Sequence, residues 1–409
     1  MVVMEKKGDI RITSATIHSG DTCRLVFEIE KQDKKFALYY EVDRPYGGYF
    51  CDVADGVVVT FLSYAMRGGY DIVSEVPVSE KLYYQITEHL VPQFLAATPD
   101  AYDTRIICDT VNPRYAPSEV AMAMSCGLDS LASYYKSIED GKQSAYKVSL
   151  LTFFQNGAHH MGTIGHDERE PVVFEEQLSH VKQFCEKINV PLLAVRSNLD
   201  AVLSELFWKD SYQNTHSFRN AGFVLLFQKL IKTYFYGAAY TAVDFDASLK
   251  KGDSAKFDIF LFPNVSTANT DIYVTESAMT RIEKILYLDR YPEVYDALLV
   301  CYKGAKNCGT CVKCRRTLVE LDFAGVLDKY EKCFDLPSYK KRRKEFVIRT
   351  FIKKDRGATY RDVYTYSKKE KLGIPASWYA ISYVGSIVRN VVEFSNRCLK
   401  RLARLKKDK

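Results

Sequence analysis

The sequence predicts an α/β protein built around a doubly wound parallel sheet, with an N-terminal α+β module before it and a helical, basic segment after it. Between residues 116 and 330, short apolar runs of strand length alternate with longer stretches of helical periodicity. Such alternation is typical of parallel sheets whose strands are linked by helices. We therefore expect three parts, at residues 1–115, 116–330 and 331–409.

The composition is that of a globular protein, with 409 residues of which 47% are hydrophobic and 26% charged. No apolar run approaches the roughly 18 residues that span a bilayer, and the first residues contain no apolar segment of signal-peptide length. The 11 cysteines include one tight cluster, which fits metal binding in a reducing compartment better than a secreted disulfide framework. We expect a cytoplasmic protein without a transmembrane segment.

The first 115 residues are predicted to form a small module of strands and helices. Alternating apolar and polar residues at 22–29 and 35–40 predict two strands. A helical pattern begins near Ser79 and continues to Leu90. No catalytic motif occurs in this module.

The central part is expected to contain four strands and three helices. The strands are predicted at residues 119–124, 148–154, 191–195 and 238–243, and the helices at 129–137, 172–188 and 218–236. Because ligands bind at the carboxyl ends of the strands in such sheets, the segment after the first strand is the expected place for a nucleotide.

That segment is a loop of small and hydroxyl-bearing residues, namely Ser125, Cys126, Gly127, Leu128, Asp129 and Ser130. A strand followed by a small-residue loop and a helix is an arrangement by which backbone amides hold phosphate. The loop is not a Walker A motif, because no Gly-Lys-Ser/Thr follows. Cys126 has two interpretations: a small residue tolerated in a turn, or a nucleophile or sulfur carrier activated by the helix N-terminus.

A second motif consists of four cysteines with the spacing C-x6-C-x2-C-x2-C, namely Cys301, Cys308, Cys311 and Cys314. Four thiolates this close can form one tetrahedral shell around Zn²⁺. An iron–sulfur cluster is the alternative, but the tight spacing around Gly309 favours a structural zinc knuckle. A closed four-cysteine site has no open position, so it would support the fold without taking part in chemistry.

The loop resembles the S-G-G-x-D-S loop of the PP-loop ATP pyrophosphatases, with Cys126 at a position that is usually glycine. A PP-loop domain followed by such a cysteine set is similar to the 7-cyano-7-deazaguanine synthase family. Two more segments carry the resemblance: residues 151–160, a strand ending in a polar loop, and the Arg219-Asn220 pair. It covers about residues 116–325, so the chain resembles a divergent member with N- and C-terminal extensions.

The resemblance implies an adenine nucleotide alpha-hydrolase-like sheet and an ATP-dependent ligase that forms AMP and pyrophosphate. A carboxylate would attack the α-phosphate, and a nitrogen nucleophile would convert the acyl-adenylate into an amide; in the family proper a second ATP then gives a nitrile. The loop residues would bind ATP and Mg²⁺. The implied catalytic residues are Asp129, Ser130 and Arg219, and the implied substrate-binding residues are Asn156, His159, His160 and Asn220.

The C-terminal segment is strongly basic, with 21 Lys/Arg and 6 Asp/Glu from Leu336 to Lys409. From Ser386 onward, apolar residues recur at helical spacing, at Val388, Val392, Leu399, Leu402 and Leu405. We interpret this stretch first as a helix packed on its own domain, and binding to a membrane or to nucleic acid as the alternatives.

Two other functions stay open at this point. The basic tail is compatible with a tRNA-modifying, thiolation-type PP-loop enzyme, and Cys126 with a catalytically reduced nucleotide-binding component of a defence or biosynthetic complex. The expected partners are a small-molecule carboxylate such as a 7-deazapurine acid, or a protein or peptide acceptor. A nucleic acid bound through the tail and a second copy in a homodimer are further candidates.

Overall fold

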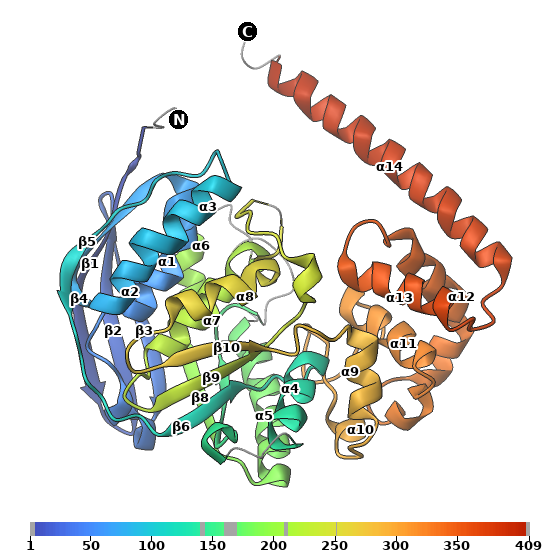
Figure 1. Cartoon of the computed structure of the whole chain (residues 1–409), viewed down its shortest axis with the longest axis horizontal. Helices are drawn as coiled ribbons and strands as arrows, with labels where there is room; N and C mark the ends of the chain where they lie inside the picture. Colours follow the sequence, from blue (N-terminus) through green and yellow to red (C-terminus); the bar gives the residue numbers. More distant parts are fainter. Residues whose placement is uncertain (1–4, 140–143, 159–169, 208–211, 251, 406–409) are drawn as a thin grey trace. The chain divides into compact units, whose positions relative to one another are not determined.

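The computed structural model describes residues 5–139, 144–158, 170–207, 212–250 and 252–405 (Figure 1). The chain divides into two compact units. Unit 1 comprises Met1–Met279 and Ala297–Lys306, and unit 2 comprises Thr280–Asp296 and Asn307–Lys409. The expected α/β class is confirmed, because unit 1 is built on a mixed, largely parallel sheet with helices packed against it.

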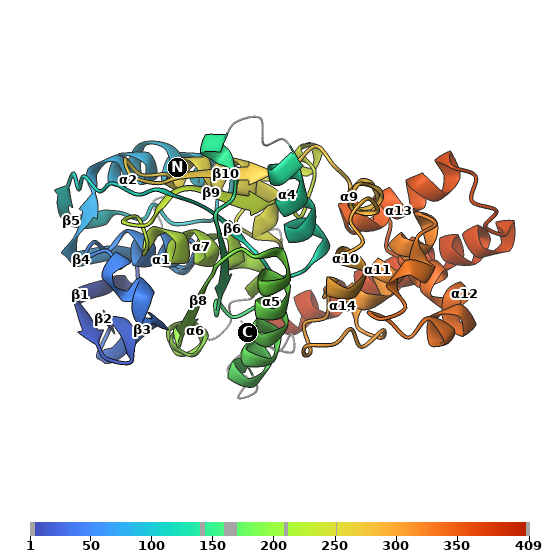
Figure 2. The ribbon, with the colours of Figure 1, turned by 90° about the horizontal axis from the view of Figure 1, so that it is seen from below.

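The sheet has ten strands in the order β10-β9-β6-β7-β8-β3-β2-β1-β4-β5 (Figures 1 and 2). Five parallel strands form one half: β6 (Glu119–Ala123), β7 (Leu150–Phe154), β8 (Leu192–Ser197), β9 (Ile231–Gly237) and β10 (Asp271–Thr275). Numbered along the chain, these strands stand in the order 3-2-1-4-5. Successive strands are therefore added on one side of β6 and then on the other, and the strand order reverses between β6 and β9. Ligands bind at such a switch point in doubly wound sheets.

Two of the three helices expected in this half, at 129–137 and 172–188, are confirmed, and two further helices were not expected. The helices of this half are α4 (Leu128–Glu139), α5 (Glu170–Ile188), α6 (Leu199–Leu206), α7 (Tyr212–Leu225) and the short α8 (Asp258–Leu261). Helix α5 lies along β7 and β8 (Figure 2). Its apolar face, which includes Phe174 and Val181, is buried.

One predicted helix and one predicted strand were wrong. The helix expected at 218–236 ends at Leu225, and the strand expected at 238–243 is instead β9 at Ile231–Gly237. A continuous apolar run has the same hydrophobic pattern in a buried helix and a buried strand. The aromatic and β-branched residues of 231–236 favour the strand, which is enclosed between β6 and β10.

Residues 1–115 extend the same sheet. The antiparallel strands β1 (Gly8–Ser19), β2 (Thr22–Lys31) and β3 (Lys34–Asp43) are followed by α1 (Asp55–Gly68), β4 (Tyr70–Ser79), α2 (Glu80–Gln85), a π-helical turn (Ile86–Leu90), α3 (Val91–Ala97) and β5 (Ile106–Val111). Strand β3 pairs antiparallel with β8 through Tyr40 and Ser197. The boundary expected near residue 115 therefore does not separate compact units.

Helix packing also joins the N-terminal residues to the central ones. Helices α1 and α7 approach closely where Gly56 faces Gly222, and a Cβ on Gly222 would lie 2.5 Å from the Gly56 carbonyl oxygen and 2.0 Å from Thr60 Oγ1. Only residues without a side chain allow this distance. The core of unit 1 is continuous across both halves of the sheet.

Unit 2 is helical, as expected for the basic C-terminal segment. Its helices include α9 (Arg281–Leu288), α11 (Val312–Phe323), α12 (Leu336–Ile352), α13 (Ala358–Lys369) and α14 (Ala376–Leu405), and α10 is Val294–Ala297. A buried ion pair from Arg281 Nε to Glu320 Oε1, at 3.1 Å, joins α9 to α11. Among the residues that the structure describes, no helix is long and apolar enough to cross a membrane.

Candidate functional site

The predicted phosphate loop lies at the switch point of the sheet. It follows the carboxyl end of β6, which has β7 on one side and β9 on the other. The next residues begin α4 at Leu128. The backbone amides at the start of this helix carry no intrahelical partner and provide partial positive charge at the loop.

The hydroxyl groups of the loop organise its backbone. Ser125 Oγ and Ser130 Oγ lie 3.3 Å apart, and the Gly127 amide donates to Ser125 Oγ at 3.3 Å. Ser130 Oγ donates to the Gly127 carbonyl at 3.1 Å. Ser125 is exposed, whereas Gly127 and Asp129 are half-buried. The loop thus presents hydroxyl and amide groups at a partly open surface.

Cys126 has a left-handed backbone conformation, with φ = +54°. This region favours glycine, and it is uncommon for a residue with a side chain. The Cys126 side chain is fully buried, and its carbonyl oxygen accepts a hydrogen bond from Leu299 N at 2.9 Å. The position therefore has the backbone of a glycine while the thiol packs inside the unit.

A glycine in the neighbouring strand β9 allows helix α4 to approach the sheet closely. Gly237, the last residue of β9, faces the first turn of α4, and a Cβ there would lie 2.9 Å from the Asp129 carbonyl oxygen and 2.8 Å from Ser133 Oγ. Ser133 Oγ accepts from Thr275 Oγ1 of β10 at 2.9 Å. Strands β9 and β10 therefore fix the position of α4 relative to the sheet.

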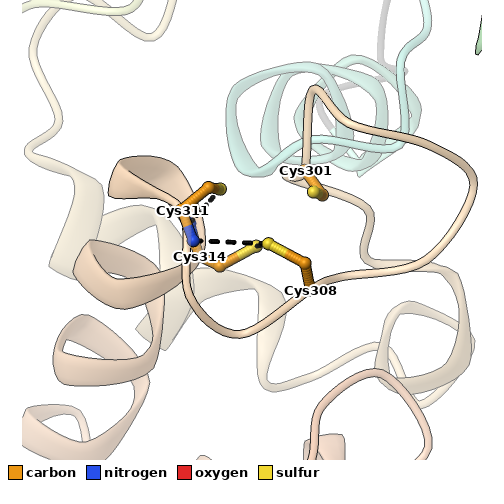
Figure 3. A group of neighbouring side chains, drawn as sticks. All are labelled: Cys301, Cys308, Cys311 and Cys314. Carbon is orange, nitrogen blue, oxygen red and sulfur yellow. Dashed lines mark hydrogen bonds between the residues drawn. The ribbon is translucent and has the colours of Figure 1, made fainter. Parts of the chain in front are cut away.

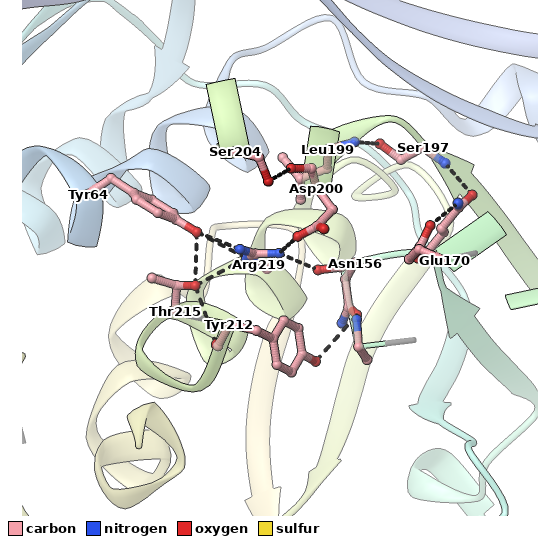
Figure 4. A network of polar contacts seen from close by, with 12 residues as sticks. Tyr64, Asn156, Glu170, Ser197, Leu199, Asp200, Ser204, Tyr212, Thr215 and Arg219 are labelled. Carbon is pink, nitrogen blue, oxygen red and sulfur yellow. Dashed lines mark hydrogen bonds and ion pairs between the residues drawn. The ribbon is translucent and has the colours of Figure 1, made fainter. Parts of the chain in front are cut away.

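Arg219 lies in a buried polar network (Figure 4). Its Nη1 donates to Asp200 Oδ1 at 2.8 Å and to the Asn156 carbonyl at 2.9 Å, and its Nη2 donates to Tyr64 OH at 2.7 Å. Its Nε also donates to Thr215 Oγ1 at 3.1 Å. These contacts make Arg219 a residue that joins α1, α6, α7 and the end of β7. Its contact with phosphate or substrate stays a prediction.

Two of the predicted substrate residues are brought together beside Arg219. Asn156 Nδ2 donates to Asn220 Oδ1 at 2.8 Å, and both side chains are buried. Asn156 follows β7, and Asn220 belongs to α7. The other two, His159 and His160, lie outside the described residues.

Sequence reasoning missed a second cluster next to these asparagines. His216 Nε2 lies 2.9 Å from Asp253 Oδ1, and Tyr240 OH donates to Asp253 Oδ2 at 3.0 Å. Burial opposes ionisation of Asp253, but His216 and the other donors lower its pKa overall. Nearby Asp258 is fully buried, and burial raises its pKa to about 7. His216 and Asp253 are 37 positions apart, and no sequence motif links them.

The four predicted metal ligands do come together (Figure 3). All four sulfur atoms lie within 4.8 Å of one another, whereas a tetrahedral zinc site would place them about 3.8 Å apart. Backbone amides donate to the sulfurs, from Cys311 N to Cys308 Sγ at 3.3 Å and from Cys314 N to Cys311 Sγ at 3.4 Å. Gly309, with φ = +65°, allows the turn between them. Cys301, Cys308, Cys311 and Cys314 form a group that can hold a metal ion.

A separate pocket of about 340 Å³ lies where the N-terminal strands meet the central ones. Its lining includes Glu41 of β3, Glu170 and Glu175 of α5, and Asp200 of α6. Arg196, also in the lining, is paired with Glu175 at 2.6 Å. The acidic lining makes this pocket unsuited to phosphate.

Comparisons with protein-family models, with curated proteins and with solved structures gave no match for this chain.

Proposed function

We propose that this protein is an ATP-dependent ligase of the PP-loop type, which adenylates a carboxylate and joins it to a nitrogen nucleophile. The observation that carries the proposal is the loop of residues 125–130 at the switch point of the sheet, between β6 and α4. A small-residue loop at a helix N-terminus and a strand's carboxyl end suits a polyphosphate. A 7-cyano-7-deazaguanine synthase-like activity is the specific form that the sequence resemblance favours.

The loop backbone supports this assignment despite the departure at Cys126. The family has glycine at that position, and the left-handed φ of Cys126 is the conformation that glycine adopts most readily. The altered residue therefore leaves the expected backbone in place. Reactive cysteines are at least partly exposed, whereas this thiol is fully buried, which favours the interpretation of Cys126 as a packed small residue.

Four of the six loop residues would have a role in the proposed reaction. Ser125, Gly127 and Ser130 would hold the pyrophosphate portion of ATP through hydroxyl and amide groups, and Asp129 would hold Mg²⁺. The magnesium ion would neutralise charge on the phosphates. In reactions at phosphorus, the contribution of the protein is mainly positioning and electrostatic stabilisation.

The buried network beside the loop would shape the substrate side. Asn156 and Asn220 are held against each other and against the Arg219 network. Arg219 is engaged by Asp200 and Tyr64, so we assign it to positioning the end of β7 and the start of α7. The cysteine group would hold a structural zinc ion, because four thiolates leave no open coordination position.

The test is a pyrophosphate-release assay with Mg-ATP and a panel of 7-deazapurine carboxylic acids, with mass spectrometry of the products. We expect AMP and pyrophosphate to form, and Ser130→Ala to lower turnover by about 100-fold while the fold is retained. Ser137→Ala is the matched control, because Ser137 lies on the same helix and its hydroxyl donates to the Tyr134 carbonyl at 2.7 Å, outside the loop. Formation of ADP, or equal losses in both variants, would contradict the proposal.

A further inference from the structure

Helix α14 (Ala376–Leu405) exposes an apolar stripe. Several of its aliphatic and aromatic side chains are more than 40% exposed: Ile381, Val384, Ile387, Val388, Val391, Val392 and Phe394. They recur at intervals of three and four residues, so they occupy one broad side of the helix. In the sequence the same spacing continues through Leu399, Leu402 and Leu405.

The opposite side of α14 packs on the other helices of unit 2. Near the start of α14, Tyr379 stacks on Phe351 of α12 with ring centroids 5.2 Å apart, and from Ser382 onward the packed residues are small or polar. Ser382 is 1% exposed and Ser386 is 4% exposed, and Ser386 Oγ donates to the Ile352 carbonyl of α12 at 3.1 Å. Gly385 also faces α12, because a Cβ there would lie 2.6 Å from Ile352 Cδ1. Glu393 pairs with Arg356.

From Ser382 onward, this arrangement is the reverse of an ordinary surface helix. A helix that only covers its own domain buries its apolar side and exposes its polar side. Here the polar side is buried, and the apolar side faces outward over about four turns. The expectation that α14 simply packs on its own domain therefore explains only one side of it.

The charge of α14 limits what can cover the stripe. Residues 376–409 contain eight Lys/Arg and two Asp/Glu. Two copies of the helix would bring these positive charges together with too few acidic residues to neutralise them. An anionic lipid surface offers both an apolar phase for the stripe and negative charge for the basic residues, which contribute about 1 kcal/mol each near such a surface.

We propose that α14 is a membrane-surface helix: its apolar stripe inserts into the headgroup boundary of an anionic bilayer while its small, polar side stays docked on unit 2. This role is independent of the proposed ligase activity. It would concentrate the protein at a lipid surface.

The test is co-sedimentation of the full chain with vesicles of phosphatidylcholine alone and with added phosphatidylglycerol. We expect binding to the anionic vesicles that weakens as salt rises, because screening reduces attraction between the basic residues and the headgroups. Val388→Asp with Val391→Asp should reduce binding by about tenfold or more, because charged residues are then forced into the apolar boundary. The melting temperature should not change, because both valines are more than half exposed.

The matched control is Asn390→Asp with Asn396→Asp, which adds the same charge on the same helix at exposed positions away from the centre of the stripe. It should retain binding within about threefold of the unaltered protein, because only the electrostatic part of binding is weakened. Equal losses in the two double variants, or no binding of the unaltered chain to anionic vesicles, would overturn the proposal. So would a solution mass of twice 46.8 kDa that falls to the monomer value in the valine variant, since a second copy would then cover the stripe.

Discussion

The left-handed backbone at Cys126 can be tested by comparing two substitutions at that position. A residue with a side chain destabilises the folded state by about 1–2 kcal/mol when its backbone is left-handed, whereas glycine does not. Cys126→Gly removes the strain and also removes two buried heavy atoms, each contributing about 0.8 kcal/mol. Cys126→Ala keeps the strain and removes only the sulfur. Because the relief of strain offsets the lost methyl group and the larger conformational entropy of unfolded glycine, we expect the two variants to be equally stable to within about 1 kcal/mol.

This near-equality differs from the usual order of stabilities. At a right-handed position the alanine variant would be more stable by roughly 1.5 kcal/mol, because glycine loses more conformational entropy on folding and lacks the buried methyl group. Denaturant unfolding of both variants, followed by circular dichroism, measures the difference. An alanine variant ahead by more than about 1 kcal/mol would refute the left-handed assignment and the glycine-like interpretation of this loop.

Turnover of the same variants separates the two roles considered for the thiol. A packed small residue predicts that Cys126→Gly retains or improves pyrophosphate release, because the loop then has the residue that its backbone favours. A nucleophile or sulfur carrier predicts that both variants bind ATP but form no product. Binding of a fluorescent ATP analogue, measured beside turnover, distinguishes a lost reaction from a lost site.

Four further predictions concern the rest of unit 1 and the cysteine group. Asp129→Ala should lower pyrophosphate release by about 100-fold with ATP as substrate, because the proposed magnesium ion would lose a carboxylate ligand. The purified chain should contain about one zinc ion by elemental analysis. Cys308→Ser should lower both the zinc content and the melting temperature, whereas the control Cys333→Ser should change neither. Finding iron with sulfide in place of zinc would contradict this prediction. Asp200→Asn should lower the free energy of unfolding by about 3 kcal/mol, because Arg219 is left as a buried, unpaired charge. Burial raises the pKa of Asp258 from 3.8 to about 7. The free energy of unfolding therefore contains a contribution from protonated Asp258 that is complete below about pH 4 and is lost as pH rises to 7. Denaturant unfolding measured from pH 4 to 8 should show a smaller decline of this free energy in Asp258→Asn than in the unaltered protein.

The features that the sequence predicted correctly are local in the chain. The cysteine group spans residues 301–314, so its spacing alone indicates that the sulfurs can meet. The first three central strands and their two following helices were also predicted, because each has a distinct hydrophobic period and a polar boundary. The hydrophobic pattern gave a wrong prediction at β9, because an unbroken apolar run fits either a buried strand or a buried helix.

The features that were missed depend on contacts between distant residues. Tyr40 and Ser197 pair across β3 and β8 and merge the N-terminal strands with the central sheet, and no periodicity records that pairing. The proposed role of Arg219 in neutralising a phosphate or a substrate carboxylate stays a prediction, but its contacts with Tyr64 and Asp200, 155 and 19 positions away, were not foreseen. A lone arginine motif does not reveal whether its charge is already neutralised inside the protein.

The structure also relates the two sequence motifs through the segment that precedes the cysteine group. Leu299 N donates to the Cys126 carbonyl at 2.9 Å, and Gln177 Nε2 of α5 donates to the Cys301 carbonyl at 2.9 Å. The backbone that carries the first cysteine is therefore held by the loop on one side and by α5 on the other. A metal ion bound through Cys301 would restrict this segment, and the restriction would extend to a loop residue whose backbone conformation is already unfavourable. This connection gives a physical reason for a closed four-cysteine site to accompany the predicted phosphate loop without contributing an open coordination position to the proposed chemistry.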